Sequence, residues 1–165
     1  MTRDEFLARF GSVFENRPDL VEAVWALGPD CGSAAALHAG FAAVLHGLQG
    51  EALTAFLNGH PDLAGRLLEQ GAVTEDSAKE QGSAGLDMLD AAARARFLAM
   101  NADYRARFGF PFIMAVHGRG AAEIVAAFEA RLGNTVEAER AEAVRQIGRI
   151  LLLRLEDRFG VGAAG

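Results

Sequence analysis

The 165-residue sequence is short of several residue types and patterns, and each shortage excludes a class of protein. Cys31 is the single cysteine, so the chain cannot form an internal disulfide or a cysteine-based zinc site, and it fits a reducing compartment. Only four prolines accompany 19 glycines, without a Gly-X-Y period, which excludes collagen-like and polyproline structures. No apolar run reaches the roughly 18 residues that would span a bilayer.

Positive charge is scarce as well. The chain has 16 basic residues against 22 acidic ones, a formal net charge of −6 and no basic cluster, so its surface should repel phosphate backbones. Acids stand near the N-terminus where a secretory signal peptide carries basic residues, and the C-terminus carries no peroxisomal address. We therefore expect a cytoplasmic protein that binds neither nucleic acid nor a membrane.

What the sequence does contain is typical of one globular domain. Apolar residues make up 51% and charged residues 23% of the chain, which excludes disorder, and the length favours a single domain, 1–165. Thr2 and Glu5 have the spacing of a capping box, and Phe6, Phe10 and Phe14 follow in four-residue steps. Helical patterns continue at about 18–27, 33–47, 51–58, 61–70, 90–107, 119–132 and 135–158, with a short helix within 71–87.

Local residues mark several helix ends. Pro18 suits a first turn, Ser33 and Asn134 are expected to be N-caps, and Gly109 should end the helix at 90–107. The segment 110–116, Phe-Pro-Phe-Ile-Met-Ala-Val, favours β structure but has no second strand to pair with, so we interpret it as a buried extended connection. The sequence thus predicts an all-α, single-domain bundle of about seven to nine helices.

His60 is the first candidate for chemistry. It precedes Pro61, and a residue before proline is disfavoured in helical geometry, so His60 should lie just ahead of the next helix. The positive end of that helix's dipole favours the neutral imidazole, which could act as a base or an acid near neutral pH. The alternative is that His60 is only a helix cap or a surface residue.

A second group is Ser77, Glu80 and Gln81, spaced i, i+3 and i+4. If this segment is helical, a hydroxyl, a carboxylate and an amide share one face and could hold a ring rich in N–H and C=O groups. The alternative is a solvated helical turn.

Arg154 is the third candidate. On a helix its position falls in the middle of the apolar face, among Ile147, Ile150, Leu151 and Leu155. A buried guanidinium must be paired, because an uncompensated charge in a core costs on the order of several kcal/mol. Its partner is either a protein carboxylate, in a structural salt bridge, or a substrate carboxylate, which arginine can bind bidentately.

Other reactive residues give weaker signals. His38 and His46 lie eight positions apart, too far for an i, i+4 metal pair, and His117 lies in a glycine-containing turn. Cys31 has no activating base beside it, and no His-Glu-x-x-His, Gly-x-Ser-x-Gly or Walker motif is present. We therefore expect no metal site, and the residues point to cofactor-free acid–base chemistry on an anionic substrate.

Several motifs, in this order and at this spacing, resemble those of the 2-oxo-4-hydroxy-4-carboxy-5-ureidoimidazoline (OHCU) decarboxylase family. They span about 6–158: Phe10-Gly11-x-Val13-Phe14-Glu15 with Trp25, the His-Pro-Asp-Leu run at 60–63, Ser77-x-x-Glu80-Gln81, the Tyr-Arg-x-x-Phe-Gly-Phe-Pro-Phe run at 104–112, and Arg154-Leu155.

The resemblance implies an all-α, usually homodimeric enzyme without a cofactor, which removes CO2 from OHCU and yields (S)-allantoin in uric-acid degradation. The substrate's imidazolone ring would accept the charge that decarboxylation leaves. His60 and Glu80 would be catalytic and share the proton transfers, and Arg154 would orient an anionic group. The other substrate-binding residues implied are Pro61, Ser77, Ala78, Lys79, Gln81, Phe112, Ile113, Met114, Ala115 and Val116.

Two other functions fit the same residues. One is a related lyase that acts on a different ureido or imidazole acid. The other is a non-catalytic helical binding module, in which His60, Glu80 and Arg154 are surface and salt-bridge residues. Convergence of these three on one concave pocket would favour an enzyme.

Overall fold

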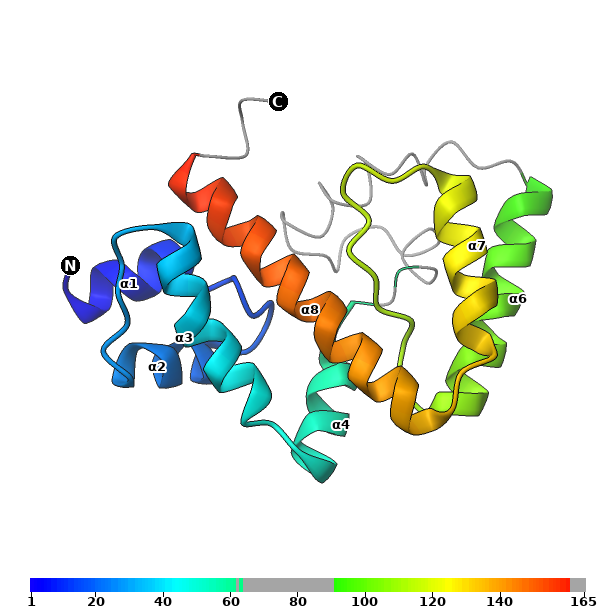
Figure 1. The fold of residues 1–165 in the computed structure, drawn as a ribbon, viewed down its shortest axis with the longest axis horizontal. Coiled ribbons are helices and arrows are strands. Elements are labelled where there is room, and N and C mark those ends of the chain that lie inside the picture. The colour runs from blue at the N-terminus through cyan, green and yellow to red at the C-terminus, as the bar shows by residue number, and fades with distance from the viewer. Residues whose placement is uncertain (62, 64–90, 161–165) are drawn as a thin grey trace. The chain divides into compact units, whose positions relative to one another are not determined.

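The computed structural model describes residues 1–61, 63 and 91–160, and every regular element within them is a helix (Figure 1). In chain order these are α1 (Arg3–Phe10), α2 (Pro18–Ala26), α3 (Ala34–His46), α4 (Gly50–Gly59), α6 (Ala91–Phe108), α7 (Ala121–Leu132) and α8 (Val136–Phe159). The all-α prediction is confirmed. The helices expected at 61–70 and within 71–87 lie outside the described residues. No helix in the described ranges is long and apolar enough to cross a membrane.

The chain divides into two compact units. The first consists of Met1–Leu53 and Ile147–Gly165, and the second of Thr54–Gln146. Both boundaries fall inside helices, so α4 and α8 each contribute residues to both units. Within the first unit α2 packs against both α1 and α3, and within the second unit α6 packs against α7.

The first unit is built around phenylalanine side chains. The capping box at its start is confirmed, because the Thr2 hydroxyl accepts the Glu5 N–H at 3.3 Å and Glu5 accepts the Thr2 N–H at 2.6 Å. Phe6, Phe10 and Phe14 are all buried, as predicted. Helix α1 nevertheless ends at Phe10, so Phe14 reaches the core from the following turn, with its ring 5.2 Å from that of Phe41.

Two of the three predicted helix starts are correct. Pro18 occupies the first turn of α2, and the Ser33 hydroxyl caps α3 by accepting the Ala36 N–H at 3.1 Å. Asn134 is not the N-cap of α8. The helix begins at Val136, so the capping position is residue 135, where the Thr135 hydroxyl accepts the Ala138 N–H at 3.2 Å.

The second unit places the apolar segment 110–116 against helices. Gly109 ends α6 in a left-handed conformation (φ 77°), and its N–H donates to the Arg105 carbonyl at 2.9 Å. All seven residues that follow are buried and belong to no helix or strand, which confirms a buried connection. The Tyr104 ring meets Phe112 and Phe128 edge-on at 5.4 and 5.8 Å, and these two rings stack at 3.8 Å. Aromatic packing therefore attaches this segment to α6 and α7.

Candidate functional site

The structure places the predicted site residues in both units. His60 and Pro61 follow α4 in the second unit, half-buried, and the His60 N–H donates to the Leu57 carbonyl at 3.2 Å. Phe112–Val116 are buried in the same unit, and Arg154 lies on α8 in the first unit. Residues 77–81, including Glu80, lie outside the described residues. Convergence of His60, Glu80 and Arg154 on one pocket therefore stays a prediction.

Arg154 is buried, as its helical phase predicted, with 3% of its surface exposed. Its Nη1 lies 3.1 Å from Oε2 of Glu15 and donates to the Val13 carbonyl at 3.0 Å. We call Arg154 and Glu15 the Arg154 pair. Of the two partners that the sequence left open, the protein carboxylate is present. A contact between Arg154 and a substrate stays a prediction.

The turn that carries Glu15 is unusual. Glu15 has φ 59°, the left-handed region that non-glycine residues rarely occupy, and only 7% of it is exposed. The turn is attached to α8 a second time, because Arg158 donates to the Ser12 hydroxyl at 2.8 Å. Helix α1, which precedes the turn, is also attached, because Arg9 donates to the Arg158 carbonyl at 2.8 Å. Helix α8 thus fixes the backbone that presents Glu15 to Arg154.

His38 has a structural contact of its own. Its Nε2 lies 2.9 Å from the Gly148 carbonyl within the first unit. Within the residues that the structure describes, no three His, Cys, Asp or Glu side chains gather in a metal-ligand arrangement.

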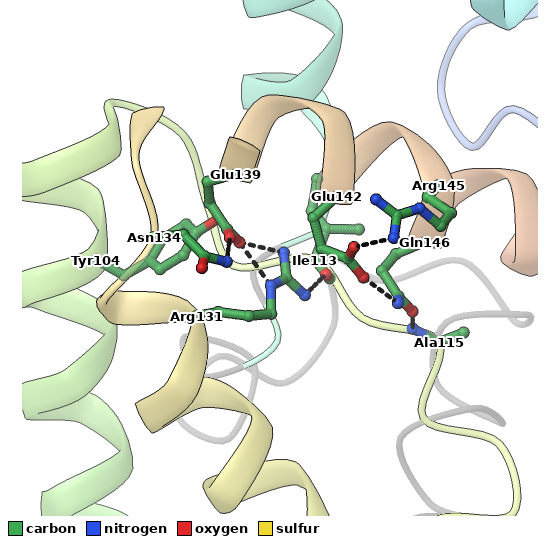
Figure 2. Close-up of polar contacts among 9 residues, drawn as sticks. All are labelled: Tyr104, Ile113, Ala115, Arg131, Asn134, Glu139, Glu142, Arg145 and Gln146. Carbon is green, nitrogen blue, oxygen red and sulfur yellow. Dashed lines mark hydrogen bonds and ion pairs between the residues drawn. The ribbon is translucent and has the colours of Figure 1, made fainter. Parts of the chain in front are cut away.

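The buried segment 112–116 is held by two side chains that the sequence did not single out (Figure 2). Arg131 on α7 donates from Nη1 to the Ile113 carbonyl at 2.5 Å. Gln146 on α8 accepts the Ala115 N–H through Oε1 at 3.0 Å, and its own amide donates to Glu142 at 2.7 Å. Two peptide groups of the predicted substrate-binding segment are therefore fixed from outside it.

Arg131 belongs to a buried polar cluster, which we call the Arg131 network: Arg131, Glu139, Tyr104, Asn134 and the Ile113 carbonyl (Figure 2). Glu139, with no exposed surface, accepts hydrogen bonds from Arg131 Nε at 2.5 Å, Tyr104 Oη at 2.6 Å and Asn134 Nδ2 at 3.0 Å. Arg131 Nη2 also lies 2.5 Å from that carboxylate, in an ion pair. The opposite charges of Arg131 and Glu139 compensate each other inside the unit.

Tyr104 acts as a permanent donor in this network. Burial, and then the hydrogen bond to Glu139, raise the pKa of the Tyr104 hydroxyl far above its ordinary value. The hydroxyl therefore keeps its proton at neutral pH. The Arg131 guanidinium also lies 4.4 Å from the centre of the Phe112 ring, which adds a cation–π contact to the same segment.

The sequence contained a signal for this network. Arg131 follows Ile124 and Phe128 at helical spacing, and Glu139 precedes Ala143 and Ile147 at four-residue steps, so both charges lie on apolar faces. The same phase argument that singled out Arg154 singles out these two residues. What the phase could not give is that the two charges pair with each other.

Comparisons with known proteins agree in pointing to one family. A family model described as OHCU decarboxylase matches residues 1–156. The 2-oxo-4-hydroxy-4-carboxy-5-ureidoimidazoline decarboxylase of Amia calva is 38% identical over 157 residues, covering 95% of this chain and 89% of that protein. The protein of the same name from Mus musculus is 38% identical over 156 residues, covering 94% and 87%.

A solved structure shares the fold. The crystal structure of (S)-allantoin synthase superposes with a TM-score of 0.73 at 25% identity over 96% of this chain, which spans about half, 51%, of that crystallised chain. With the motifs at 60–63, 104–112 and 154–155 inside the matched range, the chain belongs to the OHCU decarboxylase family.

Proposed function

We propose that this protein removes CO2 from OHCU and forms (S)-allantoin, in the degradation of uric acid. The observation that carries this proposal is the family match over residues 1–156, supported by decarboxylases 38% identical over nearly the whole chain. The likeness to (S)-allantoin synthase supports the S configuration of the product.

The reaction requires the protein to orient the substrate and to move protons. Breaking the bond to the carboxylate leaves an electron pair that the substrate's imidazolone ring accepts, so the residues need only orient the substrate and move protons. Arg154 would hold an anionic group of the substrate, such as the departing carboxylate. His60 and Glu80 would take up the proton of the substrate hydroxyl and deliver a proton to one face of the ring, which sets the S configuration.

The segment 112–116 would complete the site. Burial supports this role, since Phe112, Ile113, Met114, Ala115 and Val116 are each at most 7% exposed. Excluding water from a ring substrate strengthens each hydrogen bond that the backbone makes to it. Pro61, Ser77, Ala78, Lys79 and Gln81 would be the other residues that contact the substrate.

The deciding experiment follows CO2 release and circular dichroism with freshly generated OHCU. OHCU decays spontaneously to racemic allantoin, so an enzyme-free reaction is run in parallel. We expect wild-type protein to accelerate CO2 release and to produce an excess of the S enantiomer. His60→Ala and Glu80→Ala should each abolish that excess, while the matched variants His46→Ala and Glu51→Ala, at exposed positions, should retain it.

The other possible results of this experiment distinguish the alternative functions. Wild-type-like turnover by both His60→Ala and Glu80→Ala would overturn the assignment of the catalytic residues. Turnover of a different ureido acid, with none of OHCU, would favour the related lyase. If no such acid is turned over, the binding module gains support.

The resemblance implies the assembly, and the composition of the sequence indicates the location. We infer that the chain acts as a single-domain subunit of a homodimer in the cytoplasm. Light scattering during size-exclusion chromatography would test the dimer, for which the expected mass is twice that of the 17.5 kDa chain. A monomer with full activity would contradict this part of the proposal.

A further inference from the structure

Arg131 and Gln146 hold the two peptide groups on either side of Met114. Arg131 binds the carbonyl of the Ile113–Met114 peptide, and Gln146 binds the N–H of the Met114–Ala115 peptide. Both contacts lie within the second unit. Arg131 reaches the segment 112–116 from α7, and Gln146 reaches it from α8 (Figure 2). Met114 is thus fixed through its neighbours' peptide groups, although its side chain contributes no polar contact.

Peptide planarity determines where Met114's own polar groups point. In a trans peptide the C=O and the N–H lie on opposite sides of the bond. The Met114 N–H therefore points away from Arg131, and the Met114 carbonyl points away from Gln146. Neither group makes a hydrogen bond to another of the described residues, although Met114 is only 7% exposed. Buried backbone groups are nearly always satisfied, so a ligand with a matching donor and acceptor is expected there.

We infer that Arg131 and Gln146 are positioning residues that aim the N–H and C=O of Met114 at the –NH–CO– edge of a cyclic ureide. This inference rests on the proposed function, which supplies such a ring as the substrate. A cyclic ureide carries one donor and one acceptor side by side, which matches the pair that Met114 offers. Neither Arg131 nor Gln146 is required to touch the substrate.

The Arg131 network explains why Arg131 can serve this purpose. An arginine side chain has many rotamers, and it aims a carbonyl only if its own position is fixed. Glu139 fixes Nε of Arg131, and Tyr104 and Asn134 fix Glu139. The central carbon of the Arg131 guanidinium lies over the Phe112 ring. On the other side, the Gln146 amide is oriented by its donation to Glu142, which in turn contacts Arg145 at 2.7 Å.

The test uses Gln146, which is half-buried and can be changed with little risk to folding. Gln146→Leu removes the acceptor for the Ala115 N–H. Gln146→Glu keeps the acceptor for the Ala115 N–H, but the new carboxylate cannot donate to Glu142 and is repelled by it. The double variant Glu142→Gln with Gln146→Glu restores both hydrogen bonds with the amide and the carboxylate exchanged. Arg96→Gln, which removes an exposed arginine paired with Glu129, is the control for a lost polar contact.

Two measurements are made on each variant. The first is KM and kcat for OHCU. The second, independent of catalysis, is the affinity for hydantoin, a simple cyclic ureide, together with the change in the Met114 amide resonance on binding. We expect Gln146→Leu to raise both KM and the hydantoin Kd about tenfold, which is the loss of affinity expected from one missing hydrogen bond. The effect on kcat should be smaller. The double variant should recover to within about threefold, and Arg96→Gln should match wild type.

The outcomes separate this inference from the proposed function. Wild-type KM and hydantoin affinity in Gln146→Leu, or no recovery in the double variant, would overturn the positioning role even if OHCU is decarboxylated. Hydantoin binding at Met114 that depends on Gln146, without decarboxylation of OHCU, would support the positioning role and overturn the proposed function. Absence of both activity and hydantoin binding in the wild type would overturn both.

Discussion

The Arg154 pair in the first unit and the Arg131 network in the second are built to the same plan. In each, an arginine on a helix contacts a buried glutamate and donates to a carbonyl in a non-helical segment: Val13 for Arg154 and Ile113 for Arg131. Both arginines lie on apolar helical faces. Each therefore attaches an irregular piece of backbone to a helix by means of a compensated buried charge.

The two glutamates differ. Glu139 belongs to a regular helix, has no exposed surface and accepts hydrogen bonds from three residues. Glu15 stands in a turn, in the left-handed region at φ 59°. Such a conformation costs on the order of 1–3 kcal/mol and persists mainly where function requires it. From this comparison we predict a structural and positioning role for the Arg131 network and a direct functional role for the Arg154 pair.

The largest expected effect is on stability. Glu139→Ala leaves Arg131 buried without its counter-ion and should lower the free energy of unfolding by about 4 kcal/mol. Glu15→Gly should cost about half as much, because glycine adopts a positive φ without strain, which offsets part of the lost ion pair with Arg154. Urea unfolding of both variants, with the exposed Glu129→Ala as control, measures the difference. Equal losses would remove the distinction between the two glutamates.

The next effect is on catalysis. Arg154→Leu should raise KM for OHCU by about 30- to 100-fold, which corresponds to a lost charge-assisted contact of about 2–3 kcal/mol. Because this change removes the contact between Arg154 and Glu15, the double variant Arg154→Leu with Glu15→Gln is measured alongside it. If both variants fold and keep wild-type KM, or if Arg154→Leu only unfolds and the double variant is fully active, the purely structural salt bridge is favoured.

A pH measurement isolates the Arg131 network. Tyr104 is the only tyrosine in the chain. Its pKa is raised in the folded state, whereas in the unfolded chain the pKa of tyrosine is about 10. The unfolded state therefore loses this proton first. The contribution of Tyr104 to the free energy of unfolding is therefore complete below about pH 10. Above that pH the contribution falls by about 1.4 kcal/mol for each pH unit.

Two observations check that pH dependence. Ultraviolet absorbance should show tyrosinate near about pH 10 only in the unfolded protein. The Tyr104→Phe variant should lose this part of the alkaline slope, whereas Glu15→Gln should keep it. Titration of Tyr104 near its ordinary pKa in the folded protein would mean that the hydroxyl is not held by Glu139.

The smallest expected effect distinguishes Asn134 from Thr135. Asn134→Ala should cost about 1 kcal/mol through its lost bond to Glu139, and Thr135→Ala about 1 kcal/mol through the lost helix cap. In double-mutant cycles Asn134→Ala should couple to Tyr104→Phe, since both bind Glu139, while Thr135→Ala should be additive. If the losses of stability in Asn134→Ala and Tyr104→Phe were additive, Asn134 would not belong to the Arg131 network.

Much of the fold was predictable because its signals are local. The capping box at Thr2 and Glu5, the Ser33 cap and the Gly109 stop each depend on residues within one helical turn. Asn134 was assigned one position too early, since Asn and Thr both cap helices well and stand side by side. For the site, the family motifs pointed to His60, Glu80 and Arg154, whose convergence is still a prediction.

The sequence by itself determined that three charges on helices would be buried, because helical phase alone places Arg154, Arg131 and Glu139 on apolar faces. Only the tertiary structure decided which group each charge meets. Arg154 contacts Glu15, and Arg131 contacts Glu139 and the Ile113 carbonyl. Phase is a property of one helix, whereas a partner is chosen by the packing of segments that are distant along the chain.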